Sequence, residues 1–269
     1  LDGRGGDPGH NAIVDSGTPV YGMSHLLGIF PFYNTDHIKE VEFDKSSSNS
    51  KYGGRLSSTT QLLPNKILPS YFSIQGNIGV LASQVTLAAP INSKTGFYIS
   101  GRKTYIDEVV GPLIKNGSES NDVNGMNYGF SDGNFTFLSQ LSKKNLLTID
   151  AFVSADALQV KDGNLALKTS LKWSNFIVSP TLGTTFSSKV FMSNAFYFSQ
   201  YSNDLRMDQA TIQFGASSYV KDFGFNNSLK YIIKNIPIES CFQYVLHKKK
   251  KKKISIKNLN DSSNAFQDS

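Results

Sequence analysis

The sequence predicts a mainly β protein that forms an antiparallel membrane barrel, for two reasons. From residue 71 onward, segments with alternating apolar and polar residues follow one another, and several are longer than the usual length of about five or six residues in soluble sheets. Short and longer connections also alternate, and strands joined in this way are typical of outer-membrane barrels. The short turns are expected at 92–95, 142–145, 187–189 and 234–237, and the longer loops at 107–125, 159–164 and 203–209.

About nine strands are expected in this part of the chain, at 71–80, 84–91, 96–106, 126–141, 146–158, 165–186, 190–205, 211–234 and 236–247. The alternation is clearest in 146–158, where Leu147 and Ile149 fall on one face and Thr148 and Asp150 on the other. A sheet that spans a membrane has to be closed, because hydrocarbon offers no partner for unpaired backbone groups. A soluble β-sandwich or lipocalin-like barrel is the alternative, because both faces of 191–201 carry aromatic residues.

The composition agrees with a β-rich protein that has a polar but weakly charged interior. Charged residues make up 18% of the chain and aromatic residues 12%, whereas soluble domains have about 25% charged residues. The net charge of +6 comes from six consecutive lysines at 248–253. Without these six, the 27 basic residues fall to 21, which equals the 21 acidic residues. The body of the chain therefore has no basic surface of the kind that binds nucleic acid.

No residues suggest a catalytic centre, a metal site or a cofactor. Cys241 is the only cysteine, and the four histidines are scattered, with no carboxylates at metal-ligand spacing. There is no nucleophile elbow and no pair of carboxylates suited to acid–base chemistry. We therefore expect that the protein is not an enzyme and holds no cofactor. No apolar run approaches the ~18 residues of a transmembrane helix.

The first 66 residues differ from the rest and suggest a small folded unit. Residues 1–13 form a Gly-rich loop without the helix or the closing lysine of a phosphate-binding loop. A strand, a turn and a second strand are expected between residues 12 and 21, and a further strand at 38–43. We expect a short helical turn at 25–30, another at 108–113, and a linker bounded by proline at 62–69.

Several ordered motifs resemble the TonB-dependent outer-membrane receptors of the Bacteroidetes type. The similarity covers nearly all of residues 4–247, and its motifs are RGGDPGHN at 4–11, GTPVY at 17–21, SHLLG at 24–28, YGGRLSS at 52–58 and SGRKTY at 100–105. By this resemblance, residues 1–66 are the later part of a plug domain and 67–247 are the first part of a transmembrane barrel. Residues 248–269 are then a basic tail of low complexity.

The resemblance implies that the chain is a fragment of a receptor that imports a scarce ligand across the outer membrane of a Gram-negative bacterium. Import would use energy-coupled movement of the plug. The expected partners are the TonB–ExbB–ExbD complex, a small-molecule, glycan or peptide ligand and membrane lipid, with a surface lipoprotein as a further candidate. A passive porin or a structural barrel protein is the alternative function. The sequence does not distinguish siderophore, vitamin, glycan and peptide as ligands.

Three departures from the family pattern affect this interpretation. Ser16 is inserted between Asp15 and Gly17, where the family reads Asp-Gly. Ser46, Ser47 and Ser48 replace the Gly-Gly that precedes the YGGRLSS motif. The segment that would carry the TonB box and the first half of the plug is absent, which questions energy coupling by this chain alone.

The end of the chain also departs from the family. Receptors of this kind close with about 22 strands, and the strand pattern here is expected to stop at His247, just before the lysine run. The remaining polar residues show no alternation. We expect that a shift of reading frame at an adenine-rich codon run produced this tail. An open sheet of about nine strands would leave two long edges exposed.

The candidate site residues belong to the plug motifs and to one early barrel strand. Arg4, Asp7, His10 and Asn11 are candidates for ligand contact in the plug loop, although their structural use in backbone turns is favoured over it. Tyr52, Arg55 and Arg102 are candidates for contact between plug and barrel.

Overall fold

The computed structural model describes residues 11–22, 25, 31, 33–45, 58–105, 126–162, 166–210 and 212–258, with the backbone alone for 250–254, 257 and 258. All regular elements in this part of the chain are β-strands. No helix among these residues has the length and hydropathy needed to cross a membrane.

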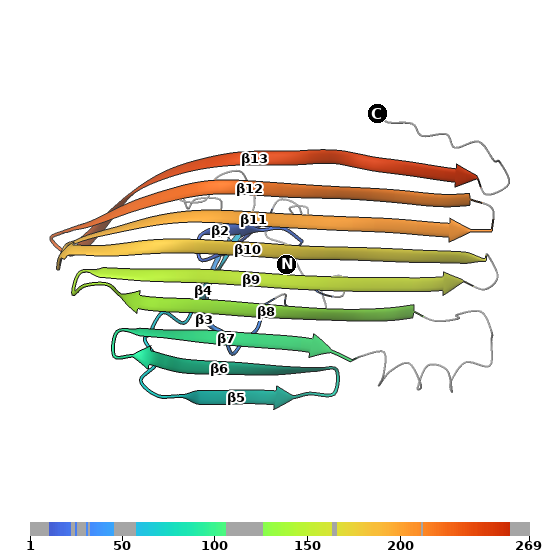
Figure 1. Cartoon of the computed structure of the whole chain (residues 1–269). Coiled ribbons are helices and arrows are strands. Elements are labelled where there is room, and N and C mark those ends of the chain that lie inside the picture. The colour runs from blue at the N-terminus through green and yellow to red at the C-terminus, as the bar shows by residue number, and fades with distance from the viewer. Residues whose placement is uncertain are drawn as a thin grey trace.

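The strands form two sheets, a small sheet of four strands and a large sheet of nine (Figure 1). The small sheet has the order β2-β1-β4-β3 and consists of β1 (Ala12–Asp15), β2 (Thr18–Val20), β3 (Ile38–Asp44) and β4 (Thr59–Pro64). In the large sheet, strands that are consecutive in the sequence are neighbours, and all pairs are antiparallel. It consists of β5 (Ser73–Ile78), β6 (Ala82–Asn92), β7 (Thr95–Thr104), β8 (Met126–Gln140), β9 (Asn145–Asp162), β10 (Leu167–Ser187), β11 (Val190–Gln209), β12 (Ile212–Ile233) and β13 (Ile236–Asn258).

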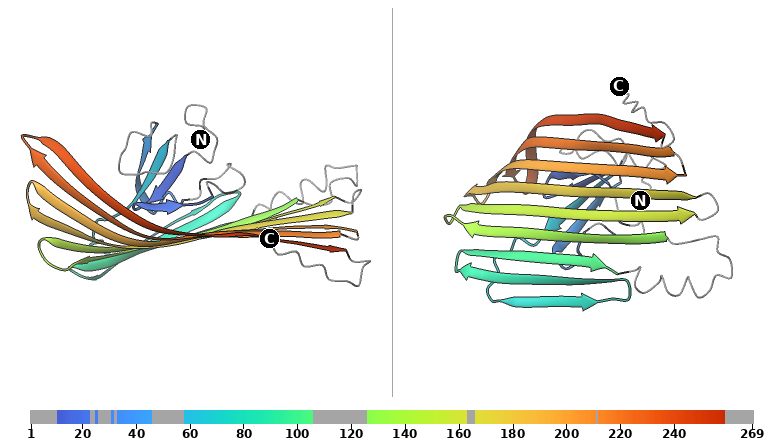
Figure 2. Two further views of the ribbon diagram at one scale, coloured as in Figure 1. Left: turned by 90° about the horizontal axis from the view of Figure 1, so that it is seen from above. Right: turned by 45° about the vertical axis from the view of Figure 1, so that its right-hand side comes forward.

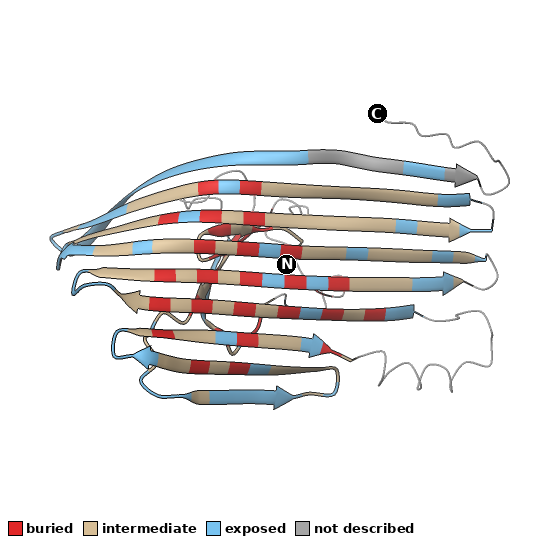
Figure 3. Ribbon diagram, viewed as in Figure 1, coloured by how far each residue is buried: buried red, intermediate tan, exposed pale blue. Residues whose placement is uncertain are grey.

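All four short strands lie on the same face of the large sheet, which we call its inner face (Figure 2). The large sheet is long, twisted and open, with β5 and β13 at its edges. Buried residues are concentrated where the small sheet covers the middle of β8 to β12 (Figure 3). The prediction of about nine strands, several of them long, and of the four short turns between them is confirmed, as is the strand–turn–strand segment near the N-terminus.

Two tight turns have the backbone geometry expected of two-residue hairpins. Ser16 and Gly17 join β1 to β2 with φ of 49° and 83°, and Lys234 and Asn235 join β12 to β13 with φ of 47° and 67°. Positive φ at both central residues defines the type I′ turn, whose twist matches that of the flanking strands. The inserted Ser16 is therefore part of the turn itself.

Four expectations about element boundaries are wrong. The linker expected at 62–69 begins inside β4, which pairs with both β1 and β3 and buries Leu62 completely. The loops expected at 159–164 and 203–209 are largely strand, because β9 continues to Asp162 and β11 to Gln209. The strand expected to end at His247 continues through the lysine run to Asn258, paired with β12. In each case a long-range ladder of hydrogen bonds outweighs the local polar composition. The helical turn expected at 108–113 and most of the one expected at 25–30 lie outside the described residues.

The outer face of the large sheet is apolar, unlike the outer face of a soluble sheet. A row of outward residues crosses eight strands in register: Leu87, Ile99, Phe135, Ala151, Val178, Phe198, Phe223 and Leu246. Ring contacts such as Phe198–Phe223, with centroids 4.8 Å apart, link neighbouring strands. We call this row, with the outward rows on either side of it, the apolar band.

The inner face of the large sheet is mostly polar, although the small sheet buries it. Its buried residues include Asp132, Asn134, Thr136, Asp150, Ser154, Asp156, Asn175, Ser179, Ser199 and Asp222. A polar inner face and an exposed apolar band are the arrangement of a membrane barrel, in which lipid takes the place of a hydrophobic core. The alternation in the sequence therefore corresponds to an exposed apolar face and a polar face under the small sheet.

An arginine at Ile149 should disrupt membrane integration, because Ile149 lies on the outer face between Phe137 and Pro180. We expect Ile149→Arg to cost roughly 2–4 kcal/mol of stability in a bilayer. The matched control is Gln159→Arg, on the same face of β9 but opposite Asn127 and Ser170, where the cost should be below about 1 kcal/mol. Denaturant unfolding in lipid vesicles measures both, and equal costs would contradict the assignment of the band.

Candidate functional site

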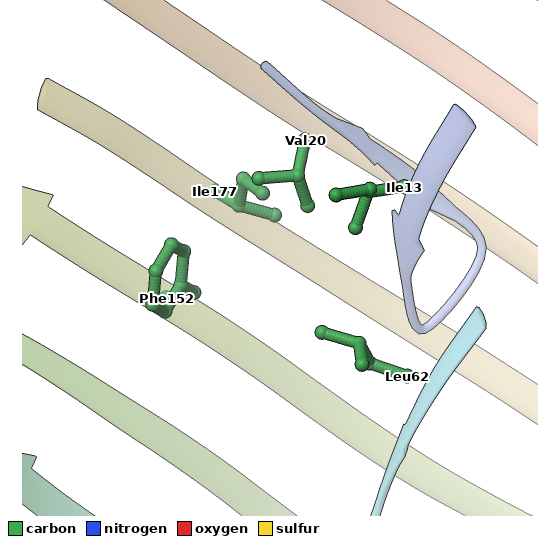
Figure 4. Close-up of a cluster of buried hydrophobic side chains, with 5 residues drawn as sticks. All are labelled: Ile13, Val20, Leu62, Phe152 and Ile177. Atoms are coloured by element: carbon green, nitrogen blue, oxygen red, sulfur yellow. The ribbon is translucent and has the colours of Figure 1, made fainter. Parts of the chain in front are cut away.

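The small sheet is held on the large sheet by one apolar cluster and three polar ones. In the apolar cluster, Ile13, Val20 and Leu62 of the small sheet point toward Phe152 and Ile177 of the large sheet (Figure 4). All five side chains are at most 7% exposed, so burial of apolar area contributes to this contact. The rest of the contact is built from polar side chains.

The first polar cluster, which we call the His25 cluster, surrounds a histidine that is 1% exposed. His25 Nδ1 lies 2.8 Å from Asp156 Oδ1, and His25 Nε2 lies 3.4 Å from Asp132 Oδ2. The ring stacks on Phe130 with centroids 4.0 Å apart and an angle of 9° between the planes. Tyr128 donates its hydroxyl hydrogen to Asp156 at 2.5 Å. Residues of β8 and β9 thus enclose a side chain that comes from the N-terminal region.

Arg102 completes the His25 cluster from β7. Its Nε and Nη2 both lie 2.7 Å from Asp132 Oδ2, and Nη2 donates to the carbonyl oxygen of Pro31 at 2.8 Å. The guanidinium also lies 4.9 Å from the centre of the Phe130 ring. Arg102, a candidate from the sequence, therefore contacts both the large sheet and the N-terminal region.

The charges of the His25 cluster balance only when His25 is protonated. Two aspartates then face one arginine and one imidazolium. Burial alone would lower the pKa of His25, but the hydrogen bonds and negative charges of Asp132 and Asp156 outweigh it and raise the pKa above its ordinary value of 6.5. A buried ion pair that loses one partner leaves an uncompensated charge, which costs roughly 3–5 kcal/mol.

The second polar cluster, which we call the Asp150 cluster, lies under β1 and β3. Thr136 donates to Asp150 Oδ1 at 2.8 Å, so its hydroxyl oxygen accepts from His37 Nε2 at 3.0 Å. Lys66 Nζ lies 3.5 Å from Asp150 Oδ2. Burial lowers the pKa of His37 to about 4, despite the charge of Asp150. His37 is therefore neutral and carries its proton on Nε2.

Asp15, at the end of β1, is a buried carboxyl close to the Asp150 cluster. Burial and the negative charge of Asp150 raise the pKa of Asp15 to about 7, while Lys66 opposes this shift. Asp15 therefore holds its proton over most of the acidic range. Near neutral pH, it adds a second negative charge beside Asp150 as it ionises.

The third polar cluster joins β2 and the residue after it to β11 and β12. Tyr21 donates to Asp222 Oδ2, and His247 Nδ1 lies 2.5 Å from Asp222 Oδ1. Ser199 donates to the carbonyl oxygen of Pro19 at 2.8 Å, and Asn226 Nδ2 donates to that of Gly17 at 3.0 Å. These bonds fix the β1–β2 hairpin to the part of the large sheet nearest the β13 edge.

The other candidates from the sequence divide into two groups. Asn11 is buried, and its side-chain oxygen accepts from the backbone nitrogen of Ser58 at 3.3 Å and from the Ser58 hydroxyl at 2.7 Å. It thereby ties the start of β1 to the start of β4. Arg4, Asp7, His10, Tyr52 and Arg55 lie outside the described residues.

Sequence reasoning missed most of the polar contacts. In the sequence His25 and His37 are scattered histidines without nearby carboxylates, but their partners come from strands about a hundred residues later in the chain. Asp132, Asp150, Asp156 and Asp222 all lie on the inward side of long alternating strands. An aspartate on the inward side of a strand is a sequence signal for a polar contact, since a buried carboxylate needs a partner. Among the described residues, no group of three or more His, Cys, Asp or Glu side chains is arranged so that it could hold a metal ion.

Comparisons of sequence give no match, since neither a family model nor a curated protein is similar to the chain. Solved structures with a similar fold include FecA, a ferric citrate transporter in its unliganded form, with a TM-score of 0.68 and 7% identity over 96% of this chain and 41% of FecA. For BauA, the ferric preacinetobactin receptor of Acinetobacter baumannii, the TM-score is 0.60 and the identity 11%, over 96% of this chain and 43% of BauA. For FauA, the alcaligin outer-membrane receptor of Bordetella pertussis, the TM-score is 0.59 and the identity 10%, over 93% of this chain and 40% of FauA.

The fold is therefore that of the TonB-dependent outer-membrane receptors, with the small sheet in the position of their plug and the large sheet in that of their barrel wall. The chain spans about two fifths of the length of these structures. The three proteins are receptors or transporters by name, and none is named as an enzyme.

Coupling between His25 and Asp156 should be large, because both side chains are about 1% exposed and in direct contact. We expect His25→Gln to weaken the seating of the small sheet by roughly 3–5 kcal/mol. A double-mutant cycle with Asp156→Asn should give a coupling of at least about 1 kcal/mol. Denaturant unfolding in lipid vesicles provides the free energies, and additive effects would show that the contact has no energetic role.

The seating of the small sheet should weaken as the pH rises. His25 binds its proton more tightly in the folded protein, so its contribution is complete below pH 6.5 and is lost as the pH rises through its folded pKa. Asp15 also binds its proton more tightly in the folded protein, because its pKa is raised from 3.8 to about 7. Its contribution to stability is therefore lost as the pH rises from about 3.8 to about 7. Asp15→Asn should therefore stabilise the protein by roughly 1–4 kcal/mol at pH 8.

The same Asp15→Asn variant should differ little from the original chain near pH 4, where Asp15 is protonated in the folded state. Unfolding measured at both pH values supplies this internal control. A stabilisation that is independent of pH would mean that ionisation of Asp15 is not the cause.

Proposed function

We propose that this chain is part of a TonB-dependent outer-membrane receptor of the Bacteroidetes type, with the later part of the plug and the first strands of the barrel. The whole receptor would import a scarce ligand across the outer membrane of a Gram-negative bacterium, by energy-coupled movement of the plug. The names of FecA, a ferric citrate transporter, and BauA, a ferric preacinetobactin receptor, favour iron chelates as the ligand class. Vitamins, glycans and peptides are the other candidates.

The observation that carries this proposal is the polar seat of the small sheet. Buried aspartates of the large sheet, namely Asp132, Asp150, Asp156 and Asp222, meet side chains of the N-terminal region. Hydrogen bonds of this kind can be exchanged for bonds to water when the plug moves, whereas an apolar core would have to be exposed. A seat made this way suits an element that must be held firmly and still be displaced.

The expected partners follow from this proposal. The TonB–ExbB–ExbD complex would act through a segment on the N-terminal side of these residues, and lipid would contact the apolar band. A surface lipoprotein is a further candidate partner at the outer end of the barrel. A passive porin is less well supported, because the small sheet covers the inner face that would line an open pore.

Uptake by the intact gene product that contains this chain tests the proposal. Cells that carry the gene would be given radiolabelled siderophore-bound iron, cobalamin, an oligosaccharide or a peptide, with and without a functional tonB gene. We expect saturable uptake of one of these ligands that is lost without TonB. Uptake that does not saturate and is independent of TonB would instead establish a passive pore.

A variant tests whether the polar seat takes part in transport. Asp156→Asn removes a charge of the His25 cluster, and we expect it to change the rate of uptake severalfold at equal abundance in the membrane. Asp204→Asn is the matched control, because Asp204 pairs with the exposed Arg206 on the outer face. Equal effects of both substitutions would contradict a role for the seat.

A further inference from the structure

Four lysines lie on the outer face of the large sheet, within or beside the apolar band: Lys221 and Lys248 are in the outward row next to its central row, and Lys103 and Lys172 are further along the strands. Lys103 of β7 and Lys172 of β10 are exposed, Lys221 of β12 is half-buried, and Lys248 of β13 is exposed. Side chains of a strand alternate between its faces, so each lysine shares its face with an apolar residue two or four positions away. These apolar residues are Ile99, Phe176, Phe223 and Leu246, which belong to the apolar band.

The lysines lie on the same side of the central row of the band along the strands. Lys103, Lys172 and Lys221 all lie toward the end of the sheet at which β9 ends and β10 begins. From β7 to β10 there are three strand spacings, or roughly 14 Å, and from β10 to β12 roughly 10 Å. We call these four residues the lysine row.

Among the described residues, one carboxylate lies directly opposite a member of the lysine row: Asp204 of β11, across from Lys172 of β10. None of its members is in an ion pair with a described carboxylate. Lys221 lies directly opposite Lys248 across β12 and β13, and like charges in this position repel each other. Asp204 is itself bound by Arg206, whose Nε lies 2.8 Å from Asp204 Oδ1, so the outward face at this point carries one more positive charge as well as the carboxylate. An anion bound between Lys221 and Lys248 would offset the repulsion between their two positive charges.

Small side chains next to the row leave shallow depressions on the outer face. One depression, of about 750 Å³, has Lys103, Lys172 and Asp204 in its lining, together with small outward residues such as Gly129, Ser131, Ala155 and Ser174. A second, also of about 750 Å³, includes Lys103, Val85, Gly101 and Gly76. Lys103 belongs to both. Both depressions are lined largely by residues of the outer face, the face that also carries the apolar band.

We propose that the lysine row and these depressions bind a phosphate-bearing anionic lipid of the leaflet that surrounds this end of the barrel. The lysine ammonium groups would bind the phosphate, and an acyl chain would lie in a depression and along the apolar band. A soluble polyanion fits less well, because the lysines lie within or beside a surface that repels water. This proposal rests on the proposed function only in requiring that the outer face lies in a bilayer.

The test compares lipid retention by the intact gene product that contains this chain, purified in a neutral detergent. The protein is mixed with phosphatidylcholine alone or with an equimolar mixture of phosphatidylcholine and phosphatidylglycerol, and native mass spectrometry counts the bound lipids. We expect a preference for phosphatidylglycerol. The double substitution Lys103→Gln and Lys172→Gln should reduce it by roughly tenfold or more, since each lysine near a bilayer contributes about fivefold.

The matched control is the double substitution Lys94→Gln and Lys144→Gln. These lysines are exposed in the turns at the opposite end of the strands, so the preference should not change. Equal retention of both lipids by the original protein, or an equal loss in both double variants, would overturn the proposal. Heat-dependent migration of the folded barrel on a gel confirms that each variant is folded.

Inorganic phosphate provides a further arm, because free phosphate at 50 mM should displace the lipid only weakly. Complete displacement would assign the row to soluble phosphate instead of lipid. Failure of the protein to partition into membranes would remove the proposed function as well, whereas partitioning without lipid preference would remove only this inference.

Discussion

The balance of buried charge around His25 is the interaction on which the rest of the structure depends. Asp132 and Asp156 are on the inner face of long strands, where an unpaired carboxylate would cost several kcal/mol. Arg102 neutralises one charge, and His25, whose pKa the two carboxylates raise, neutralises the other when it is protonated. Among the described residues of this cluster, only the N-terminal region supplies a second group that can be positively charged, so that region stabilises the large sheet when it is in place. The buried aspartates of the inner face and the position of the small sheet therefore depend on each other, because each supplies the charges that the other needs.

Much of the fold follows from alternation in the sequence. The long strands and their short turns were predictable because one face is apolar and exposed while the other meets polar groups, which imposes a period of two over many residues. The ends of the strands were not predictable in the same way. At Asp162, Gln209 and Asn258 the strands continue through polar residues, since their hydrogen bonds come from neighbouring strands and not from local sequence.

The candidate site was less accessible to sequence reasoning. Arg102 was found because it lies on the polar face of an alternating strand within a family motif. Alternation places Asp132, Asp150 and Asp156 on the polar face of their strands in the same way. It does not show which residue of the N-terminal region each aspartate contacts. His25 and His37 come from short segments with little local structure, and their contacts depend on how the small sheet sits on the large one. Such long-range pairing is invisible to periodicity.

Accessibility along β9 tests the central claim, that one face of the large sheet seats the plug and the other meets lipid. Single cysteines would be placed at each position from 149 to 156 in a Cys241→Ser background of the intact gene product, in lipid vesicles. A lipid-soluble maleimide should label 149, 151, 153 and 155 and leave the alternate positions unlabelled, because the small sheet covers them. Labelling of the even positions, or uniform labelling, would contradict the account.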